Sequence, residues 1–539
     1  MTPTVLRDIL TQIRQTPEAP ALVSEGGITS FGALGAQVEA VLAWLQAEPP
    51  SAPVMIHGHK EPEVVATMLA CMLAGCGFVF ADRSNPIDRI ARMLRVSGAA
   101  HLLHAGEAPA LKGAVSVHPI PRASQMWQAD GCAEALAQDA DPEALLYVIF
   151  TSGSTGYPKG VPIRQRNFDA FYAWYGEMLQ QIAGQGLPPW QSGHVNHASL
   201  AFDMGMLDLW PVLALGRPVV MLNHRNNIMP QRNIAALSAK RDQVAVRSWF
   251  STPSLLQLMC TDPKFDARTL PELRCFFIGG EAVQPSLIKD LWRRFPEAEV
   301  RHAYGPSEGT CMSHVHSLVA GDLRENALLP LGPALAQNVM RIVDSEGQDV
   351  PRGTPGEVEL GGPQIVGGYI PADHPANRAF FHRDGLARYR TGDLGYEDAA
   401  GNLFLLGRAD RQVKWNGNRI ELDEIERAAH GLADVQKAAC LPVREGGQLR
   451  DIVLFVQPAS GAQLTAARCG EALAERLPQS MIPRDIRLLE HLPVTVNGKV
   501  DSAALLARLA APVPVVPEGA QRGAEADRQV QYSDNPLKT

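Results

Sequence analysis

The sequence predicts an α/β protein, with a large N-terminal body of parallel-rich sheets covered by helices and a small α+β C-terminal domain. Short apolar runs alternate with helical stretches up to about residue 405, which is the pattern of parallel strands packed between helices. A Gly- and Ser-rich segment directly follows one of these runs. Beyond residue 408 the pattern changes to a hairpin-like turn and a helix, which indicates a separate domain.

Length and composition restrict the class of protein. A chain of 539 residues is too long for one ordinary core, so two or three domains are expected. Hydrophobic residues make up 46% and charged residues 20%, as in soluble globular proteins. The net charge of −8 argues against nucleic acid as the partner. The cysteines are scattered and form no C-x-x-C pair, so reduced thiols in the cytoplasm are predicted.

The N-terminus predicts an amphipathic helix and no signal peptide, because apolar residues recur at helical spacing among charges: Leu6, Ile9, Leu10 and Ile13. Residues 64–81 contain no charge and reach the length of a membrane span. Gly75 and Gly77 interrupt this stretch, and its second part resembles a strand. We therefore predict a buried helix followed by a strand, and no membrane span.

The elements of the body follow in order. Before residue 141, strands are predicted at residues 54–56, 78–80 and 101–103, and helices at residues 63–74 and 86–96. Later, helices are predicted from about residue 167 and at residues 234–240, and strands at residues 218–222, 248–251 and 275–278. The Pro-rich, polar residues 512–539 predict a disordered tail.

Residues 145–162, LLYVIFTSGSTGYPKGVP, predict a phosphate-binding loop. The apolar run reads as a buried strand, and the small residues after it allow backbone N–H groups to approach an anion. Lys159 follows, but the Gly-Lys-Ser/Thr order of a P-loop NTPase is absent. A solvated Gly/Ser turn is the alternative interpretation.

Three acidic residues stand in distinctive surroundings. Asp203 lies among apolar residues, so it calls for a cation, although a structural salt bridge or a helix cap is an alternative. Tyr304 is suited to stack on a purine and Glu308 to hold Mg²⁺ between phosphates, unless this segment is a bare turn. Asp393, followed closely by Arg408, is suited to accept from the two ribose hydroxyls, or is an exposed loop residue.

The C-terminal part contains a predicted hairpin at residues 412–419, a helix at residues 421–431, and Lys499 on a Gly turn. That lysine is either a mobile point charge or an ordinary surface lysine.

Six motifs in this order resemble the adenylate-forming superfamily of acyl-CoA synthetases, peptide-synthetase adenylation domains and luciferases: YVIFTSGSTGYPKG, FDMGMLDLW, AYGPSEGT, YRTGDLG, GRADRQVKWNGNRIELDEIE and NGKVD. The resemblance covers about residues 5–510. Stand-alone D-alanine:D-alanyl carrier protein ligases look most similar, through Gly58-His59-Lys60-Glu61-Pro62 and Ser251-Thr252-Pro253-Ser254 among others. The resemblance implies that ATP and an amino acid form an aminoacyl-adenylate, which is then transferred to the phosphopantetheine thiol of a carrier protein.

The resemblance also implies roles for the matching residues. The nucleotide phosphates would contact Thr151, Ser152, Ser154, Thr155 and Lys159. The rest of the nucleotide would contact His302, Ala303, Tyr304, Gly305, Pro306, Ser307, Asp393 and Arg408, with His302 to Tyr304 facing adenine and the last two holding the ribose. Glu308 would bind Mg²⁺, Asp203 the substrate ammonium, and Lys499 both the substrate carboxylate and the α-phosphate.

The implied domains are an adenylation body at residues 1–408, a mobile lid at residues 409–511 and a tail at residues 512–539. Asp410 would be the hinge. The lid would swing about it so that the Asn416-Gly417 turn replaces Lys499 at the site and lines a thiol tunnel.

The implied substrate pocket suits a small neutral amino acid, because no second charge accompanies its walls: Met204, Leu207, Phe250, Phe277, Gly279, Ala303, Cys311 and Met312. Gly279 stands where D-alanine ligases tend to carry Cys. It leaves more room, unless Phe250 and Phe277 refill it. D-Alanine therefore leads, and glycine, L-alanine, serine, a β-amino acid and proline remain open.

Two other classes are distinguishable. An acyl-CoA synthetase would not need Asp203, and a non-catalytic relative would have lost Lys499 or Glu308. The carrier protein and the pathway, cell-envelope D-alanylation or a specialised metabolite, stay open.

Overall fold

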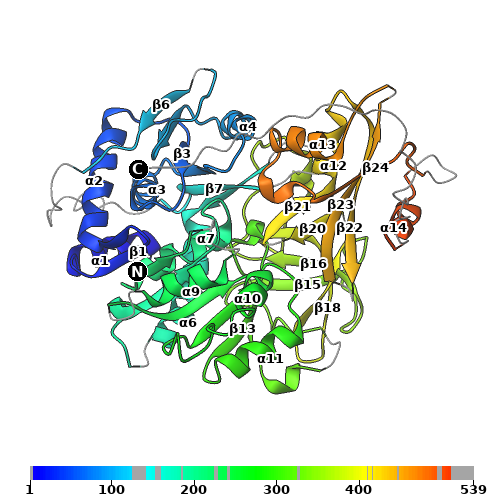
Figure 1. The fold of residues 1–539 in the computed structure, drawn as a ribbon. Helices are drawn as coiled ribbons and strands as arrows, with labels where there is room; N and C mark the ends of the chain where they lie inside the picture. The colour runs from blue at the N-terminus through cyan, green and yellow to red at the C-terminus, as the bar shows by residue number, and fades with distance from the viewer. Residues whose placement is uncertain are drawn as a thin grey trace, which may run out of the picture. The chain divides into compact units, whose positions relative to one another are not determined.

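The computed structural model describes residues 4–113, 115–123, 141–151, 159–183, 186–223, 229–239, 243–324, 328–409, 411–415, 417–445, 448–459, 461–493 and 500–510. The chain divides into two units, Met1–Glu490 and His491–Thr539. In the first unit, helices cover sheets that are largely parallel, so the predicted α/β class is confirmed (Figure 1).

One sheet of the first unit carries the strand before the predicted phosphate loop. Its order is β6-β5-β3-β4-β7-β8, with β7 and β8 antiparallel. Its strands are β3 (Val54–Gly58), β4 (Phe78–Asp82), β5 (His101–His104), β6 (Ser116–Pro119), β7 (Leu145–Thr151) and β8 (Lys159–Arg164). Helices α3 (Pro62–Leu73) and α4 (Ile87–Ser97) cover opposite faces. Consecutive residues such as Met55 and Ile56 are therefore both buried, which explains the uninterrupted apolar runs.

A second sheet, in the order β14-β13-β12-β11-β9-β10-β1-β2, carries the substrate motifs. Its strands are β1 (Pro20–Ser24), β2 (Gly27–Ser30), β9 (Ser192–Asn196), β10 (Val219–Met221), β11 (Ala245–Ser251), β12 (Cys275–Gly279), β13 (Glu299–Tyr304) and β14 (His314–Ser317). One face packs on α6 (Gln165–Ala183) and α8 (Trp210–Ala214), and the other on α9 (Pro230–Ser238), α10 (Pro253–Met259) and α11 (Pro285–Arg294).

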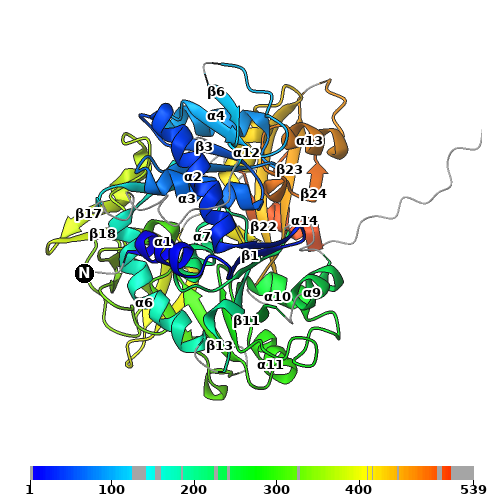
Figure 2. The ribbon, with the colours of Figure 1, turned by 90° about the vertical axis from the view of Figure 1, so that its left-hand side faces the viewer.

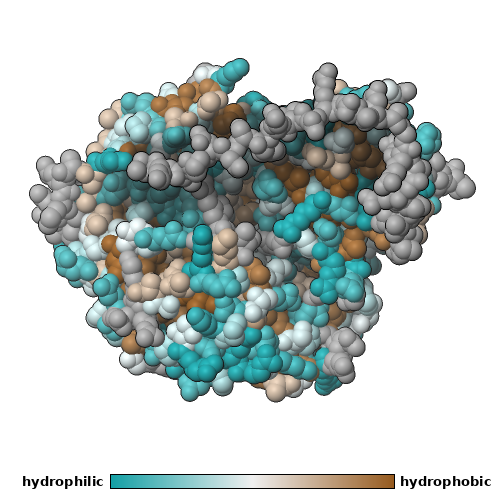
Figure 3. Space-filling model, in the orientation of Figure 1, coloured by the Kyte–Doolittle hydropathy of each residue, from teal (hydrophilic) through white to brown (hydrophobic). Residues whose placement is uncertain are grey.

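Helix α11 shows how sequence pattern sets this packing. Leu287, Ile288 and Leu291 share one side of the helix and are buried, whereas Lys289 and Arg293 are exposed. The surface over α11, at the bottom of Figure 3, is accordingly hydrophilic.

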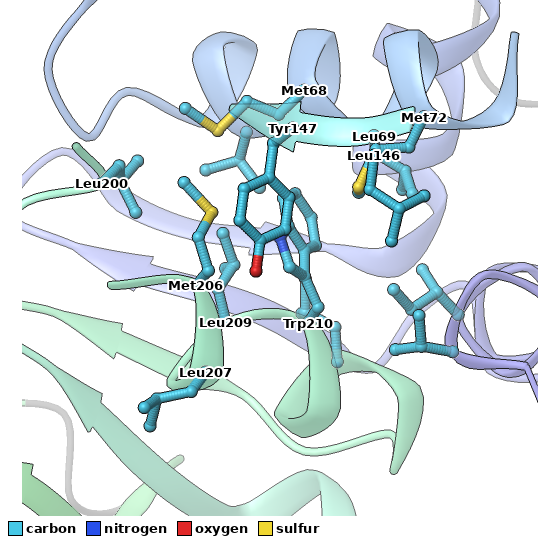
Figure 4. Packing of buried hydrophobic residues seen from close by; sticks show 14 of the residues in the cluster. Met68, Leu69, Met72, Leu146, Tyr147, Leu200, Met206, Leu207, Leu209 and Trp210 are labelled. Carbon is cyan, nitrogen blue, oxygen red and sulfur yellow. The ribbon is translucent and has the colours of Figure 1, made fainter. Parts of the chain in front are cut away.

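The core continues between the two sheets. Figure 4 shows Tyr147 of β7 against Trp210 of α8, with Met68 of α3 above them and Met206 beside them. Met206 belongs to the short helix α7 (Asp203–Leu207), so this packing supports the helix that begins with Asp203.

The N-terminal helices are as predicted. Helix α1 (Val5–Gln15) buries its apolar side and packs against α2 (Phe31–Ala47) and α3 (Figure 2). The uncharged stretch at residues 64–81 forms most of α3 and, after a turn, β4, which confirms a helix followed by a strand. Among the helices that the structure describes, none is long and apolar enough to cross a bilayer.

An antiparallel sheet that the sequence did not predict follows. It has the order β15-β16-β18-β17, with β19 paired to β18. Its strands are β15 (Val339–Val343), β16 (Gly356–Gly361), β17 (Phe380–Arg383), β18 (Leu386–Glu397) and β19 (Leu403–Arg408). Gly385 and Gly401 have φ of 74° and 87° in the tight turns that connect its neighbouring strands.

The rest of the first unit has its own core. It contains the hairpin β20 (Gln412–Trp415) and β21 (Asn418–Glu421), helices α12 (Leu422–His430) and α13 (Ala466–Ala474), and strands β22 (Val435–Glu445), β23 (Gln448–Pro458) and β24 (Asp485–Leu488). Its buried apolar residues, such as Ile425 and Leu454, pack with one another. That separate core favours the predicted boundary after residue 408, which stays a prediction.

The second unit contains α14 (Ser502–Ala510), where Asp501 Oδ1 accepts a hydrogen bond from Ala504 N at 3.0 Å. Several predicted residues lie outside the described part of the chain: Ser152, Ser154, Thr155, Asp410, Asn416, Lys499 and the tail.

Candidate active site

A cavity of about 1120 Å³ lies in the first unit, where the carboxyl ends of β7 and β13 meet α7 and the β20–β21 hairpin. Predicted site residues that line it are Thr151, Asp203, Met204, Gly305, Pro306, Ser307, Asp393 and Arg408. Ligand sites of α/β proteins lie at this end of the strands.

Asp203 opens α7 and faces the cavity. Its Oδ2 accepts a hydrogen bond from Ser307 Oγ at 2.5 Å, and its Oδ1 accepts from Met204 N at 2.8 Å. Burial raises the pKa of this carboxyl, and the two hydrogen bonds oppose that effect. Within the described chain Asp203 forms no ion pair, so a positively charged ligand group would improve its environment.

Glu308 lies in a 3-10 turn, Ser307–Gly309, and its side chain is fully buried. Arg419 Nη1 is 3.0 Å from each carboxylate oxygen, and Tyr369 donates its hydroxyl to Oε1 at 2.5 Å. Burial would raise the pKa of Glu308, but Arg419 and Lys159 outweigh it and lower the pKa to about 2. The predicted metal ligand is therefore an ionised carboxylate whose charge is balanced by the hairpin.

Lys159, the first residue of β8, is close to Glu308. Its Nζ donates to Tyr369 Oη at 3.2 Å and lies 4.3 Å from the centre of that ring. Burial, followed by repulsion from Arg419, lowers the pKa of Lys159 to about 8. At the end of β7, Thr151 Oγ1 is buried with no hydrogen-bond partner in the described chain. A ligand oxygen would satisfy this hydroxyl.

Asp393 is held by two neighbours. Tyr304 donates its hydroxyl to Oδ2 at 2.6 Å, and Arg408 Nη1 donates to Oδ1 at 2.7 Å. Tyr304 is itself buried, and Lys414 Nζ lies 5.8 Å from its ring centre. His302, predicted to face adenine with Ala303 and Tyr304, is also buried and its Nδ1 bonds Pro330 O at 2.9 Å. Burial lowers the pKa of His302 to about 4.

Most of the predicted pocket wall is buried: Leu207, Phe250, Phe277, Gly279, Ala303, Cys311 and Met312. The rings of Phe250 and Phe277 are stacked at 6.1 Å. Cys311 Sγ lies 3.7 Å from the backbone oxygen of Asp203, so the side chain of Cys311 in the wall contacts the backbone of the acidic residue.

Gly279 does not leave the expected extra room. A Cβ at this position would lie 2.6 Å from Ala303 O and 3.2 Å from Phe250 Cζ. The neighbouring strand β13 and the Phe250 ring already fill that space. These contacts favour refilling by Phe250 over extra room at Gly279, and the size of the substrate pocket stays a prediction.

The tip of the β20–β21 hairpin reaches the cavity. Gly417 N donates to Glu281 Oε1 at 2.5 Å, and the same carboxylate accepts from Ser254 Oγ at 2.5 Å through Oε2. Gly417 has φ of 75°, and a Cβ here would lie 2.9 Å from Thr252 Cγ2. Only glycine therefore fits this turn without displacement.

Some site residues had no predicted role. Tyr369 gave no signal, because it lies in an ordinary loop. Arg419 and Lys414 lie inside the motif GRADRQVKWNGNRIELDEIE, and Glu281 follows Gly279 and Gly280 at the end of β12, so their position in the sequence was the available signal. Beyond the hairpin, the cavity also passes arginines of the body and of the C-terminal part: Arg89, Arg450 and Arg484.

Comparisons with known proteins agree with this geometry. The family model of AMP-binding enzymes matches residues 9–370, and the model of their C-terminal domain matches residues 424–499. A D-alanine--D-alanyl carrier protein ligase of Bacillus licheniformis is 32% identical over 91% of this chain and 96% of its own length. Its counterpart in Bacillus cereus is 31% identical over 92% and 98%.

Solved structures show the same fold. An adenylation domain of Vibrio cholerae in complex with glycyl-adenosine-5'-phosphate has a TM-score of 0.79 at 21% identity, over 94% of this chain and 97% of that one. A peptide-synthetase protein with adenylation and carrier domains has a TM-score of 0.75 at 24% identity, over 94% and 84%. The chain therefore belongs to the AMP-binding enzyme family.

Proposed function

We propose that this enzyme activates D-alanine with ATP as an aminoacyl-adenylate and transfers it to the phosphopantetheine thiol of a carrier protein in the cytoplasm. The observation that carries the proposal is Asp203, a carboxylate that faces the cavity without an ion-pair partner in the described chain. The curated relatives at 31–32% identity, which are D-alanine--D-alanyl carrier protein ligases, support the choice of substrate.

The substrate would bind with its ammonium at Asp203. Ser307 and Met204 N hold the two carboxylate oxygens, so the charge is fixed in place before the substrate arrives. The surrounding wall is apolar, and a charged side chain would lose its solvation there. These features favour a small neutral amino acid over a fatty acid or a charged amino acid.

The phosphates of ATP would bind at Thr151 and Lys159. Thr151 has a buried hydroxyl without a partner among the described residues, and Lys159 supplies positive charge, so both fit a phosphate group. Glu308 fits Mg²⁺, because it is buried, ionised and needs a cation whenever Arg419 withdraws. The ion, when bound, would neutralise phosphate charge. Asp393 would accept from the ribose after exchanging its present hydrogen bonds.

The thiol would approach beside the hairpin. In the described orientation Arg419 binds Glu308 and Gly417 contacts Glu281 of the body, which supports a role of the hairpin in the transfer step. Arg450 and Arg484, which line the cavity, would suit the phosphate of a phosphopantetheine arm. Lys499 stays the predicted residue for adenylation.

The test is pyrophosphate exchange with a panel of D-alanine, L-alanine, glycine, serine, β-alanine, proline, acetate and a fatty acid. We expect D-alanine to have the highest kcat/KM. If another amino acid of the panel has a higher kcat/KM, that amino acid is the substrate of the same reaction in place of D-alanine. Faster turnover of acetate or the fatty acid than of every amino acid would overturn the ligase proposal.

A further inference from the structure

Two histidines and one glutamate lie together on the six-stranded sheet, outside the cavity described above. His101 begins β5, His118 lies in β6, and Glu48 directly follows α2. His101 pairs with Ser116 in the parallel register, and side chains alternate along a strand, so His101 and His118 share one face. One possible donor atom of each residue in the cluster lies within 4.8 Å of the others.

Both imidazoles have a polar atom without a partner. His101 Nδ1 and His118 Nε2 are buried atoms that form no hydrogen bond within the described part of the chain. Glu48 Oε2 lies 4.0 Å from His118 Nε2, which is too long for a hydrogen bond. A buried nitrogen without a partner is costly, so an additional atom between these groups would stabilise them.

The surroundings hold the cluster in place. The ring of Trp44 lies edge-on to His101 at 5.6 Å and tilted to His118 at 5.4 Å. Trp44 is one helical turn before Glu48, whose backbone N–H donates to Trp44 O at 3.0 Å. The indole therefore supports both imidazoles, while the end of the helix places the carboxylate beside them.

We propose that Glu48, His101 and His118 form a binding site for a divalent transition-metal ion of the Zn²⁺ type. Two imidazole nitrogens and one carboxylate oxygen are a donor set that Zn²⁺ accepts, with water at a fourth position. Tetrahedral coordination with bonds of about 2.0–2.2 Å brings donor atoms to roughly 3.5 Å from one another. Small side-chain rotations achieve this, because Glu48 is exposed and the histidines are partly exposed.

The site would have a structural role. Strand β6 is at the edge of its sheet, and Glu48 is at the end of α2, so the ion would connect an edge strand to a helix. A ligand that binds the folded chain alone stabilises it by mass action. None of the three residues lines the active-site cavity, so the metal would not take part in adenylate formation.

The experiment uses the full chain after removal of metals with EDTA and dialysis. Zn²⁺ binding is measured by calorimetry, Co²⁺ binding by visible absorption, and stability by the Tm with and without Zn²⁺. We expect one specific equivalent of Zn²⁺ and a higher Tm in its presence. His118→Ala and Glu48→Gln should each weaken Zn²⁺ binding by at least about tenfold and remove the Co²⁺ band.

His104→Ala is the matched control. His104 lies on β5, the strand of His101, but its Nδ1 already bonds Gly106 O at 2.9 Å. This variant should bind Zn²⁺ like the parent chain. Glu48→Gln alters an exposed side chain, so this variant should fold. It therefore keeps the test valid if the His118→Ala variant fails to fold. Equal Zn²⁺ affinity in the parent, His118→Ala and Glu48→Gln would overturn the site. Pyrophosphate exchange should be unchanged in every variant, which separates this test from that of the proposed function.

Discussion

Asp203 carries negative charge into the cavity with two hydrogen bonds and no ion pair in the described chain. Asp203→Asn keeps the shape of the side chain but cannot balance an ammonium. Removing one partner of a buried pair costs roughly 3–5 kcal/mol, so kcat/KM for the amino acid should fall by roughly 10²-fold to 10⁴-fold. Pyrophosphate exchange measures this loss, and calorimetry should show unchanged ATP binding.

Ser307→Ala is the graded control for that prediction. It removes one hydrogen bond to Asp203 but leaves the charge, so a loss of about tenfold or less is expected. If Asp203→Asn retains the parent kcat/KM, Asp203 has a structural role and the substrate ammonium binds elsewhere.

Lys159 predicts a pH dependence of ATP binding. Burial lowers its pKa to about 8 in the free enzyme, and phosphate contact favours the charged form. ATP affinity should therefore be greatest below pH 8 and fall as the pH rises through 8, by up to about tenfold per pH unit. Calorimetry across this range measures the change.

Lys414 also has a lowered pKa and lines the cavity, so a variant is needed to assign the effect to Lys159. Lys159→Arg keeps the positive charge at every pH of the experiment. It should flatten the profile, and a slope equal to that of the parent would assign the titration to another group.

At the residue scale, the sequence could predict types of residue but not their pairing. Asp203 was recognisable because a carboxylate among apolar residues needs a partner. Its contact with Ser307, 104 positions later, depends on how α7 meets the end of β13. The Arg419–Glu308 pair was still less accessible, because a predicted metal ligand gives no sign that a guanidinium also binds it.

Helices and strands were predictable where one spacing of apolar residues dominated the local sequence. Helix α11 has an apolar side and a charged side, and β3 is buried throughout, with an apolar run at residues 54–56, because helices cover both faces of its sheet. Sheet β15–β19 was missed. Its strands combine apolar, charged and glycine residues, as in β18 with the sequence LARYRTGDLGYE, and antiparallel pairing over tight turns leaves no helical interval to mark them.

The β20–β21 hairpin makes an element-scale prediction. Gly417 has positive φ and packs on Thr252, so Gly417→Leu should displace the hairpin tip from the body. Carrier loading from supplied aminoacyl-adenylate should fall by at least about tenfold, because a leucine side chain at this position strains the backbone and clashes with its neighbours. Pyrophosphate exchange, for which Lys499 is the predicted residue, should be largely retained.

Thr252→Ala is the matched control, because it widens the space on the other side of the same contact. Combined with Gly417→Ala, it should restore part of the loading that Gly417→Ala alone loses. The absence of any loading defect in Gly417→Leu would remove the hairpin from the transfer step.

At the scale of the whole molecule, the sequence indicated separate cores but not how they dock. The change of pattern after residue 408 predicted a separate domain, and a group of buried apolar residues lies around Ile425 and Leu454. Its docking depends on single polar contacts, such as Gly417 N to Glu281 and Arg419 to Glu308. Such contacts leave no periodic pattern in the sequence. Because they bury few apolar atoms, they are also suited to break and form repeatedly.

If the docked hairpin serves transfer and Lys499 serves adenylation, the two half-reactions should respond to different substitutions. Lys499→Ala should slow pyrophosphate exchange by about 10²-fold to 10³-fold, because one preorganised contact to developing charge is lost. Loading from supplied adenylate should survive. Arg419→Gln should do the reverse, since buried Glu308 then lacks its cation in the docked orientation but not when Mg²⁺ is bound. Asp410→Pro, at the predicted hinge, fixes φ near about −65° and should retain one half-reaction at the expense of the other. Equal loss of both half-reactions in all three variants would show that one fixed arrangement performs both steps.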